Sequence, residues 1–397
     1  MDPIKNPFVP GAGSPPPELA GRDSLLEQAR IAIARVKRGT PAKSLILVGL
    51  RGVGKTVLLV RIKEQAERDG IKALLTEAHE GKSLAALLIP QLRSILYSLD
   101  IIANAKEKVS RGLRVLRSFI GSIKVTHNEI EYELGVDPEV GVADSGDFEA
   151  DLSALFVAVG EAAKAADTAV ALLIDELQYL NEKEFGALIM AVHKINQERL
   201  PFLLVAAGLP QILGLAGNSK SYAERLFDFP RVDALPPEAA TSALAEPVAP
   251  FGVSFSPDAL TRMLEVTERY PYFLQQWGYE AWNVSAGPEI GAPDVELATG
   301  KALRVLDESF FRVRFDRCTP SEKRYLRALA ELGQGPQKSG AISEVLGVKV
   351  STVAPIRAKL IQKGMIYSQQ HGDTAFTVPM FDAYMRRVMP GNDWKSA

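Results

Sequence analysis

Eight residues near the start of the chain have the types and spacing needed to hold a phosphate chain. They read Gly-Leu-Arg-Gly-Val-Gly-Lys-Thr from Gly49 to Thr56 and match the pattern G-x-x-x-x-G-K-[ST]. The glycines let the backbone curl so that successive N–H groups point into one concavity. Lys55 is expected to reach the β- and γ-phosphates, and the hydroxyl of Thr56 to bind Mg²⁺. The other predicted nucleotide contacts are Gly49, Arg51, Gly52, Val53, Gly54 and Val57.

A pair of carboxylates supplies the second half of the predicted site. Leu172–Glu176 reads LLIDE, an apolar strand that ends in Asp175 and Glu176. Asp175 is expected to hold Mg²⁺ through water, and Glu176 to orient and polarise the attacking water. The alternative is a strand end that simply meets solvent. Because charge is costly next to an apolar strand, and because the phosphate pattern is also present, hydrolysis is the favoured interpretation.

The composition is that of an ordinary globular protein. Of the 397 residues, 47% are apolar and 24% charged, with a net charge of −2, and this length predicts two or three domains. No apolar stretch approaches the roughly 20 residues that cross a bilayer, and no export signal is recognised at the N-terminus. Cys318 is the single cysteine, so no intrachain disulfide can form. These features predict a cytoplasmic protein without a membrane partner.

Strand and helix patterns surround the two motifs. Short apolar runs at 44–49, 72–78, 169–175 and 201–208 alternate with helical stretches, which predicts an α/β fold with a parallel sheet covered on both faces. After Pro236 the pattern is helical only. We predict a P-loop ATPase core over residues 1–235 with an insertion at 104–147, a helical lid over 236–316 and a winged-helix domain over 317–397.

The combination resembles a known family. The phosphate loop, LLIDE and the upstream LAGRD segment (Leu19–Asp23) look like those of an AAA+ or STAND-type P-loop ATPase. The order of core, helical lid and C-terminal winged helix is similar to that of origin-recognition or initiator-type proteins. This resemblance implies ATP or ADP as ligand, with Mg²⁺ as cofactor.

The resemblance also implies roles for residues outside the two motifs. It places Leu19, Gly21 and Arg22 beside the adenine, although a Gly-Arg-Asp helix start is also an ordinary cap. Pro271 is expected to pack on the base. Arg225, in the segment AERLF, lies where such proteins carry an arginine finger, which would act on a neighbour's nucleotide in a homo-oligomer. The alternative for Arg225 is an ordinary surface arginine.

Two departures from the family pattern suggest slow turnover. Members of the family usually end the strand predicted here at 201–208 with a polar sensor residue. In this chain the strand is followed by Leu209 and Pro210, and the first side-chain donor is Gln211. The lid carries Arg269-Tyr270-Pro271, close to the G-x-P signature but with Arg269 in place of glycine. Both changes favour a nucleotide switch over a fast motor.

The C-terminal segment is basic and has the pattern of a winged helix. Residues 312–397 contain 14 Lys/Arg against 7 Asp/Glu, which favours a polyanionic partner. A capped helix at 319–333 precedes a helix-turn-helix and two extended runs. Pro355 implies that the recognition helix begins late, near Val353, or is kinked. Residues expected to face double-stranded DNA are Lys338, Lys349, Ser351, Thr352, Arg357, Lys359, Lys363 and, at the wing tip, His371.

Alternatives remain open at this stage. A winged helix can also bind protein, so a STAND-like signalling scaffold whose nucleotide controls oligomerisation is the rival to an ATP-dependent DNA-binding switch. A metabolic kinase is disfavoured because no acceptor-substrate site is evident. The insertion carries a helix studded with Lys106, Lys108, Arg111, Arg114 and Arg117, which predicts a surface helix, a second DNA contact or a partner-binding helix. The alternation after it indicates a hairpin.

Overall fold

A computed structural model describes residues 1–11, 19–124, 135–220, 223–368 and 372–395. The chain divides into two compact units. The sheet unit comprises Ser24–Val48 and Leu58–Arg231. The helical unit comprises Met1–Asp23, Gly49–Val57 and Val232–Ala397. The predicted phosphate loop therefore clusters with the helical unit, although the strand before it and most of the helix after it belong to the sheet unit.

The sheet unit is built on five parallel strands in the order β2-β3-β4-β1-β5. Every residue of β1, β3 and β4 is buried, as expected of strands covered by helices on both faces. Four strands were predicted, and the fifth, β5, is too short to give a pattern. The strands are β1 (Ser44–Val48), β2 (Lys72–Glu77), β3 (Val170–Asp175), β4 (Phe202–Gly208) and β5 (Phe227–Asp228).

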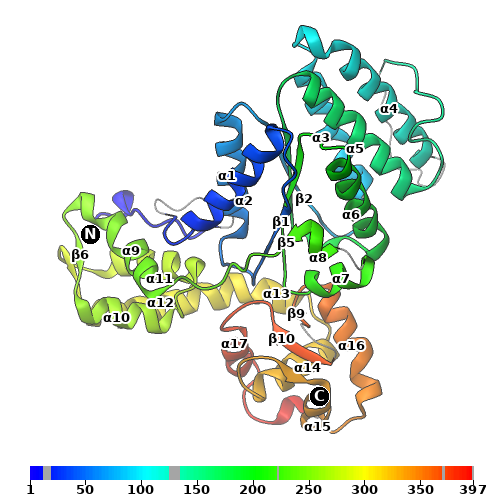
Figure 1. Ribbon diagram of the computed structural model, residues 1–397. Coiled ribbons are helices and arrows are strands. Elements are labelled where there is room, and N and C mark those ends of the chain that lie inside the picture. The colour runs from blue at the N-terminus through cyan, green and yellow to red at the C-terminus, as the bar shows by residue number, and fades with distance from the viewer. Residues whose placement is uncertain (12–18, 125–134, 221–222, 369–371, 396–397) are drawn as a thin grey trace. The chain divides into compact units, whose positions relative to one another are not determined.

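Helices cover both faces of this sheet (Figure 1). Alternate strand residues such as Ile46, Leu172 and Leu204 share one apolar core with α3, α5 and α6, while α1 and α2 lie on the opposite face. The predicted α/β fold with a doubly covered parallel sheet is thus confirmed. The helices are α1 (Asp23–Lys37), α2 (Lys55–Arg68), α3 (Leu84–Leu99), α4 (Lys106–Lys124), α5 (Phe148–Ala165), α6 (Glu182–Gln197), α7 (Ile212–Ser219) and α8 (Ala223–Leu226).

Residues 232–316 of the helical unit consist of helices, most of them α-helices, and one short strand pair. Its core contains Phe273, Trp277 and Phe311, and the N-terminal Phe8 packs so closely on α11 that a Cβ at Gly278 would lie 2.6 Å from its ring. The helices are α9 (Pro237–Val248), α10 (Pro257–Val266), α11 (Pro271–Val284), α12 (Ala292–Val305), the π-helical segment η5 (Leu306–Phe311) and α13 (Arg312–Asp316).

In its described residues, the C-terminal segment 317–397 combines four α-helices with a small antiparallel sheet in the order β8-β10-β9. The first three helices and this sheet are consistent with the predicted winged helix. Thr319 is the N-cap of the predicted helix and forms a capping box with Glu322. A final helix, α17, was not predicted. The elements are α14 (Pro320–Glu331), β8 (Gln337–Lys338), α15 (Ser339–Leu346), α16 (Val350–Gln362), β9 (Ile366–Tyr367), β10 (Asp373–Phe376) and α17 (Phe381–Val388).

The helix predicted to carry DNA contacts begins before Val353, the start that Pro355 was expected to impose. α16 starts at Val350 and contains Pro355, so the prediction of a late start near Val353 is wrong. The missing N–H of Pro355 would have bonded to the carbonyl of Ser351, four residues earlier. Ser351 lies in the exposed first turn, where water can hydrate that carbonyl.

Some predicted features fall outside the described residues, namely His371 and most of the hairpin expected after the insertion helix. Among the residues that the structure does describe, no helix combines the length and apolarity that crossing a bilayer requires.

Candidate nucleotide-binding site

Each glycine of the phosphate pattern has a physical reason to be glycine. Gly52 and Gly54 have φ values of +85° and +90°, a region that side chains disfavour. Gly49 is required by space, because a Cβ there would lie 2.1 Å from the carbonyl oxygen of Val232. The loop therefore has the curled backbone that the pattern predicts.

Lys55 lies at the start of α2 and is only 6% exposed. Its Nζ donates hydrogen bonds to the carbonyl oxygens of Gly49 and Leu50, at 2.9 and 2.8 Å. The ammonium group is therefore held over the loop's own backbone. Thr56, the predicted Mg²⁺ ligand, is exposed at the next position. A curled loop, a cation over it and an exposed hydroxyl fit a nucleotide with its Mg²⁺.

The remaining loop side chains differ in their surroundings. Val53 and Val57 are buried, so any nucleotide contact from them comes from the backbone. Arg51 is half-buried, and its backbone N–H donates to the carbonyl oxygen of Thr377 in the C-terminal segment, at 3.0 Å. Thr377 is fully buried and lies directly after β10. The loop backbone is thus bonded to the segment predicted to bind DNA.

Arg22 holds the loop from the other direction. Its guanidinium is 6% exposed and donates from Nη2 to the carbonyl oxygens of Val53, at 3.2 Å, and Asp233, at 2.5 Å. Burial lowers the pKa of this guanidinium, and the Asp233 carboxylate partly opposes that shift. The structure therefore assigns Arg22 a bracing role between the loop and the segment that leads into α9. Leu19, three residues before Arg22, is half-buried.

The lid reaches the loop through the start of α11. Pro271 is the first residue of that helix, and the N–H of Tyr272 donates to the carbonyl oxygen of Gly52 at 3.2 Å. Arg269 has a φ of +59°, which is the conformation that glycine adopts easily. This explains why the family pattern favours glycine at that position, since Arg269 must take a left-handed conformation there.

In the sheet unit, Asp175 and Glu176 lie where β3 ends. Asp175 is 4% exposed, and its Oδ1 accepts a hydrogen bond from the N–H of Glu176 at 2.8 Å. Glu176 takes a left-handed conformation, with φ 52° and ψ 39°. For a residue other than glycine, such a conformation costs on the order of 1–3 kcal/mol and is common at functional sites. The parallel register pairs Ile174 with Ala206 and Val48 with Gly208, so β1, β3 and β4 end at the same edge of the sheet.

Gln178 also lies at this edge of the sheet, and the sequence analysis did not predict it as a site residue. Its Nε2 donates to Oε2 of Glu176, and its Oε1 accepts from the N–H of Leu209 at 2.9 Å. The one sequence signal was its position two residues after Glu176. Gln211, the nearest side-chain donor after β4, differs, because its Oε1 is buried with no hydrogen-bond partner among the described residues.

Arg225, the predicted arginine finger, lies in the four-residue helix α8 of the sheet unit, and its side chain is exposed. Its role as an arginine finger stays a prediction.

The predicted DNA contacts fall into two groups. Lys349, Ser351, Thr352 and Lys359 are exposed along α16. The others have partners within the segment. Lys338 pairs with Asp373 at 2.5 Å, and Lys363 pairs with Glu322 at 2.7 Å. Arg357 donates to the Oγ1 of Thr374, the Oγ of Ser368 and the carbonyl of Asp373, which ties α16 to the small sheet.

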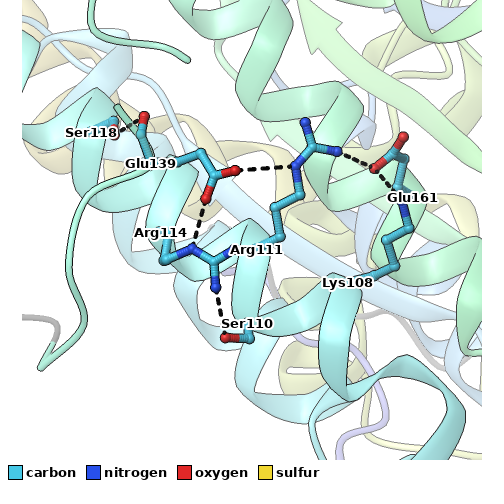
Figure 2. Close-up of polar contacts among 7 residues, drawn as sticks. All are labelled: Lys108, Ser110, Arg111, Arg114, Ser118, Glu139 and Glu161. Carbon is cyan, nitrogen blue, oxygen red and sulfur yellow. Dashed lines mark hydrogen bonds and ion pairs between the residues drawn. The ribbon is translucent and has the colours of Figure 1, made fainter. Parts of the chain in front are cut away.

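Three cations of α4 have carboxylate partners, as Figure 2 shows. Lys108 and Arg111 bond to Glu161 of α5, at 3.1 and 2.9 Å, and Arg114 bonds to Glu139 at 2.6 Å. Val109, Leu116 and Phe119 of the same helix are fully buried. Of the three predicted interpretations, a packed helix agrees best with these contacts.

The fold and the loop together define a P-loop ATPase. Residues 18–205 match a family model described as an AAA ATPase domain. Residues 308–385 match a second family, described as a domain of unknown function, DUF8462. No curated protein matches the chain.

Three solved structures are similar to this chain at low sequence identity. The Walker-type ATPase PABY2304 of Pyrococcus abyssi is 14% identical with a TM-score of 0.54, and the match covers 93% of this chain and 96% of that one. The Orc1 protein of Aeropyrum pernix, solved in complex with DNA, is 15% identical with a TM-score of 0.48 and 96% coverage of both chains. Cdc6p from Pyrobaculum aerophilum is 14% identical, with a TM-score of 0.48 and 98% coverage of both.

Proposed function

We propose that this protein is a slowly hydrolysing ATP-dependent switch that binds double-stranded DNA through a C-terminal winged helix. Lys55 binds the β- and γ-phosphates, Thr56 and Asp175 hold Mg²⁺, and Glu176 orients the attacking water. The observation that carries the proposal is that the loop backbone is hydrogen-bonded both to the lid, through Tyr272, and to the C-terminal segment, through Thr377.

These bonds supply the link between nucleotide and partner. Phosphates bind P-loops through the same backbone and through the lysine ammonium, so ATP competes with the present partners of Lys55, which are the carbonyls of Gly49 and Leu50. A ligand shifts a conformational equilibrium only through contacts that differ between states. The loop is where such differences arise, and the lid and C-terminal segment are bonded to it.

Aromatic packing continues the same connection. Tyr272 stacks on Phe310, with ring centroids 4.8 Å apart, and Phe310 contacts Phe311 at 5.3 Å. Phe311 in turn contacts Phe381 and Tyr384 of α17, at 5.7 and 5.2 Å. A change at the loop can therefore reach the C-terminal segment through packed rings as well as through the Arg51 N–H.

The exposed side of α16 supports DNA as the partner. It carries Lys349 and Lys359 with the hydroxyls of Ser351 and Thr352, and α16 itself contains no carboxylate. Lysines and hydroxyls are common donors to phosphate oxygens. Slow turnover is supported by the end of β4, where Ala206, Ala207 and Gly208 offer no side-chain donor.

The test measures the affinity of a labelled duplex for the wild type and for Lys55→Ala, each with ADP, with a slowly hydrolysed ATP analogue and with no nucleotide. We expect the wild-type dissociation constant to depend on the nucleotide and that of Lys55→Ala to be the same in all three conditions. A wild type that binds DNA with no response to nucleotide would refute the switch. No DNA affinity even at low salt would favour the rival, a scaffold whose winged helix binds protein.

Arg225 is proposed to act on the nucleotide of a second copy. Neither Arg225→Ala nor Lys55→Ala is expected to hydrolyse ATP at the wild-type rate alone. When the two variants are mixed, some interfaces pair a subunit of Arg225→Ala, which retains Lys55, with a subunit of Lys55→Ala, which retains Arg225. Such an interface has an intact loop and an intact finger. Recovery of activity on mixing supports action in trans, and its absence, when each variant still assembles, refutes it.

A further inference from the structure

We propose that Gln178 is the positioning residue for Glu176, fastening its carboxylate to the end of β4. This inference rests on the proposed function, because it assumes that Glu176 orients the water that attacks ATP. Gln178 lies two residues beyond Glu176, in the short helical turn Leu177–Tyr179 that follows β3.

The amide of Gln178 has one orientation that satisfies both of its neighbours. Its NH₂ group must face the carboxylate of Glu176, which only accepts hydrogen bonds, and its oxygen must face the N–H of Leu209, which only donates. Both bonds are present in the structure. A flipped amide would place oxygen against oxygen and NH₂ against N–H. The side chain therefore acts as a fixed bridge between the two strand ends.

The end of β4 is shaped to admit this bridge. A Cβ at Gly208 would lie 3.2 Å from Oε1 of Gln178, closer than side-chain carbons normally approach. The space beside Gly208 is thus occupied by a side chain from the turn that follows the neighbouring strand, β3.

Holding Glu176 in one orientation has a direct chemical consequence. A glutamate has three side-chain torsions, and a group that orients water must be held close to one geometry to be effective. The left-handed backbone of Glu176 sets the start of the side chain, and the bond from Gln178 fixes its carboxylate. Loss of that bond removes the fastening of the carboxylate to the end of β4 while leaving the phosphate loop unchanged.

Gln211 is the matched control. It is the same residue type, follows β4 closely and is half-buried. The buried Oε1 of Gln211 has no hydrogen-bond partner among the described residues, and its side chain does not cap α7. A glutamine-to-leucine change there removes an amide of equal size that does not contact Glu176.

The experiment compares Gln178→Leu, Gln178→Glu and Gln211→Leu in the full-length protein. Gln178→Glu retains the length of the side chain but sets a second carboxylate against Glu176. Both Gln178 variants lose the hydrogen bond to the Glu176 carboxylate. Because hydrogen bonds to charged groups are strong, we expect the kcat for ATP hydrolysis to fall by about ten- to a hundred-fold. The dissociation constant for ATP of both Gln178 variants is expected to stay near the wild-type value, while Gln178→Leu is expected to lower the melting temperature because the buried N–H of Leu209 loses its acceptor. Gln211→Leu is expected to retain the wild-type kcat.

A double variant separates positioning from a general structural effect. If Gln178 acts only through Glu176, then Gln178→Leu slows the residual single-turnover hydrolysis of Glu176→Gln by less than about two-fold. Wild-type kcat in both Gln178 variants, or an equal loss in the two backgrounds, would overturn this inference alone. Hydrolysis that does not depend on Glu176 would instead overturn the proposed ATPase mechanism and this inference with it.

Discussion

The backbone N–H of Arg51, inside the phosphate loop, donates a hydrogen bond to the carbonyl oxygen of Thr377 at 3.0 Å. Thr377 directly follows β10, the central strand of the small C-terminal sheet. One residue further along the loop, the carbonyl of Gly52 accepts a bond from Tyr272 of α11. The backbone of the loop that is expected to bind phosphate is therefore hydrogen-bonded both to α11 and to the C-terminal segment.

Tyr272→Ala is expected to weaken the response of DNA binding to nucleotide. The substitution removes the ring that stacks on Phe310, although the backbone bond to Gly52 can remain. We expect the ratio of DNA dissociation constants with ADP and with an ATP analogue to move toward one. Phe251→Ala is the control, since Phe251 forms an edge contact with Trp282 and has no ring contact with Tyr272 or Phe310. An unchanged ratio in Tyr272→Ala, with ATP binding intact, would exclude this route of coupling.

Replacing Lys349 and Lys359 together by alanine is expected to weaken DNA binding and its salt dependence. Each phosphate contact contributes about 0.9 to the slope of log affinity against log salt, so losing two contacts lowers the slope by about 1.8. The matched control replaces Lys164 and Lys183, which are exposed lysines of the sheet unit, and makes the same change in net charge. Equal losses in the two double variants would point to general electrostatics in place of an α16 contact.

Glu176→Gln is expected to bind ATP normally and to hydrolyse it slowly. The amide cannot act as a base, and residues of this kind contribute on the order of 10²–10⁴ in rate. Phosphate release under single-turnover conditions measures the rate, and fluorescence of a labelled ATP measures binding. The substitution retains the size of the side chain and so isolates the carboxylate. A wild-type rate in this variant would require a different residue to orient the water.

Stability of the C-terminal segment is expected to depend on Glu322 in acid. Burial disfavours its charge, but hydrogen bonds from Lys363 and from Thr319 outweigh burial and hold the pKa of this carboxyl below its ordinary value of 4.5. A lowered folded-state pKa adds stability above the unfolded-state pKa, and this stability is lost as the pH falls through the folded-state value.

Glu322→Gln is therefore expected to lower the free energy of unfolding at neutral pH. It is also expected to reduce the further loss that the wild type shows below pH 4.5. Urea denaturation between neutral and acid pH measures both effects. Equal pH slopes for the variant and the wild type would show that Glu322 does not contribute to this dependence.

The sequence predicted the features that local pattern determines. The phosphate loop, four strands and the capped helix start near Thr319 each follow from residue types at fixed spacing, and the structure contains them. β5 was missed because two residues give no periodicity. Gln178 was missed because its role depends on Leu209, which only strand pairing brings near it. Likewise, the bond between Arg51 and Thr377 joins residues far apart in the chain, and backbone partners of that kind leave no sequence signal.

Charge in the C-terminal segment shows the same limit. A count of basic residues indicates a polyanionic partner, but a count does not show which cations already have partners. Lys338 and Lys363 form ion pairs within the segment, and Arg357 bonds to the small sheet. The exposed cations of α16 are thus fewer than the composition suggests, which is why the predicted loss on DNA binding centres on Lys349 and Lys359.

Reciprocal linkage tests the central claim most directly. If ATP changes the affinity for DNA by some factor, DNA must change the affinity for ATP by the same factor. The measurement is the dissociation constant of ATP for Glu176→Gln, with and without saturating duplex at low salt. The account predicts a shift equal to that seen in the DNA titrations, within the range of about 5- to 150-fold that is typical of allosteric coupling. Identical ATP affinities with and without bound DNA would contradict it.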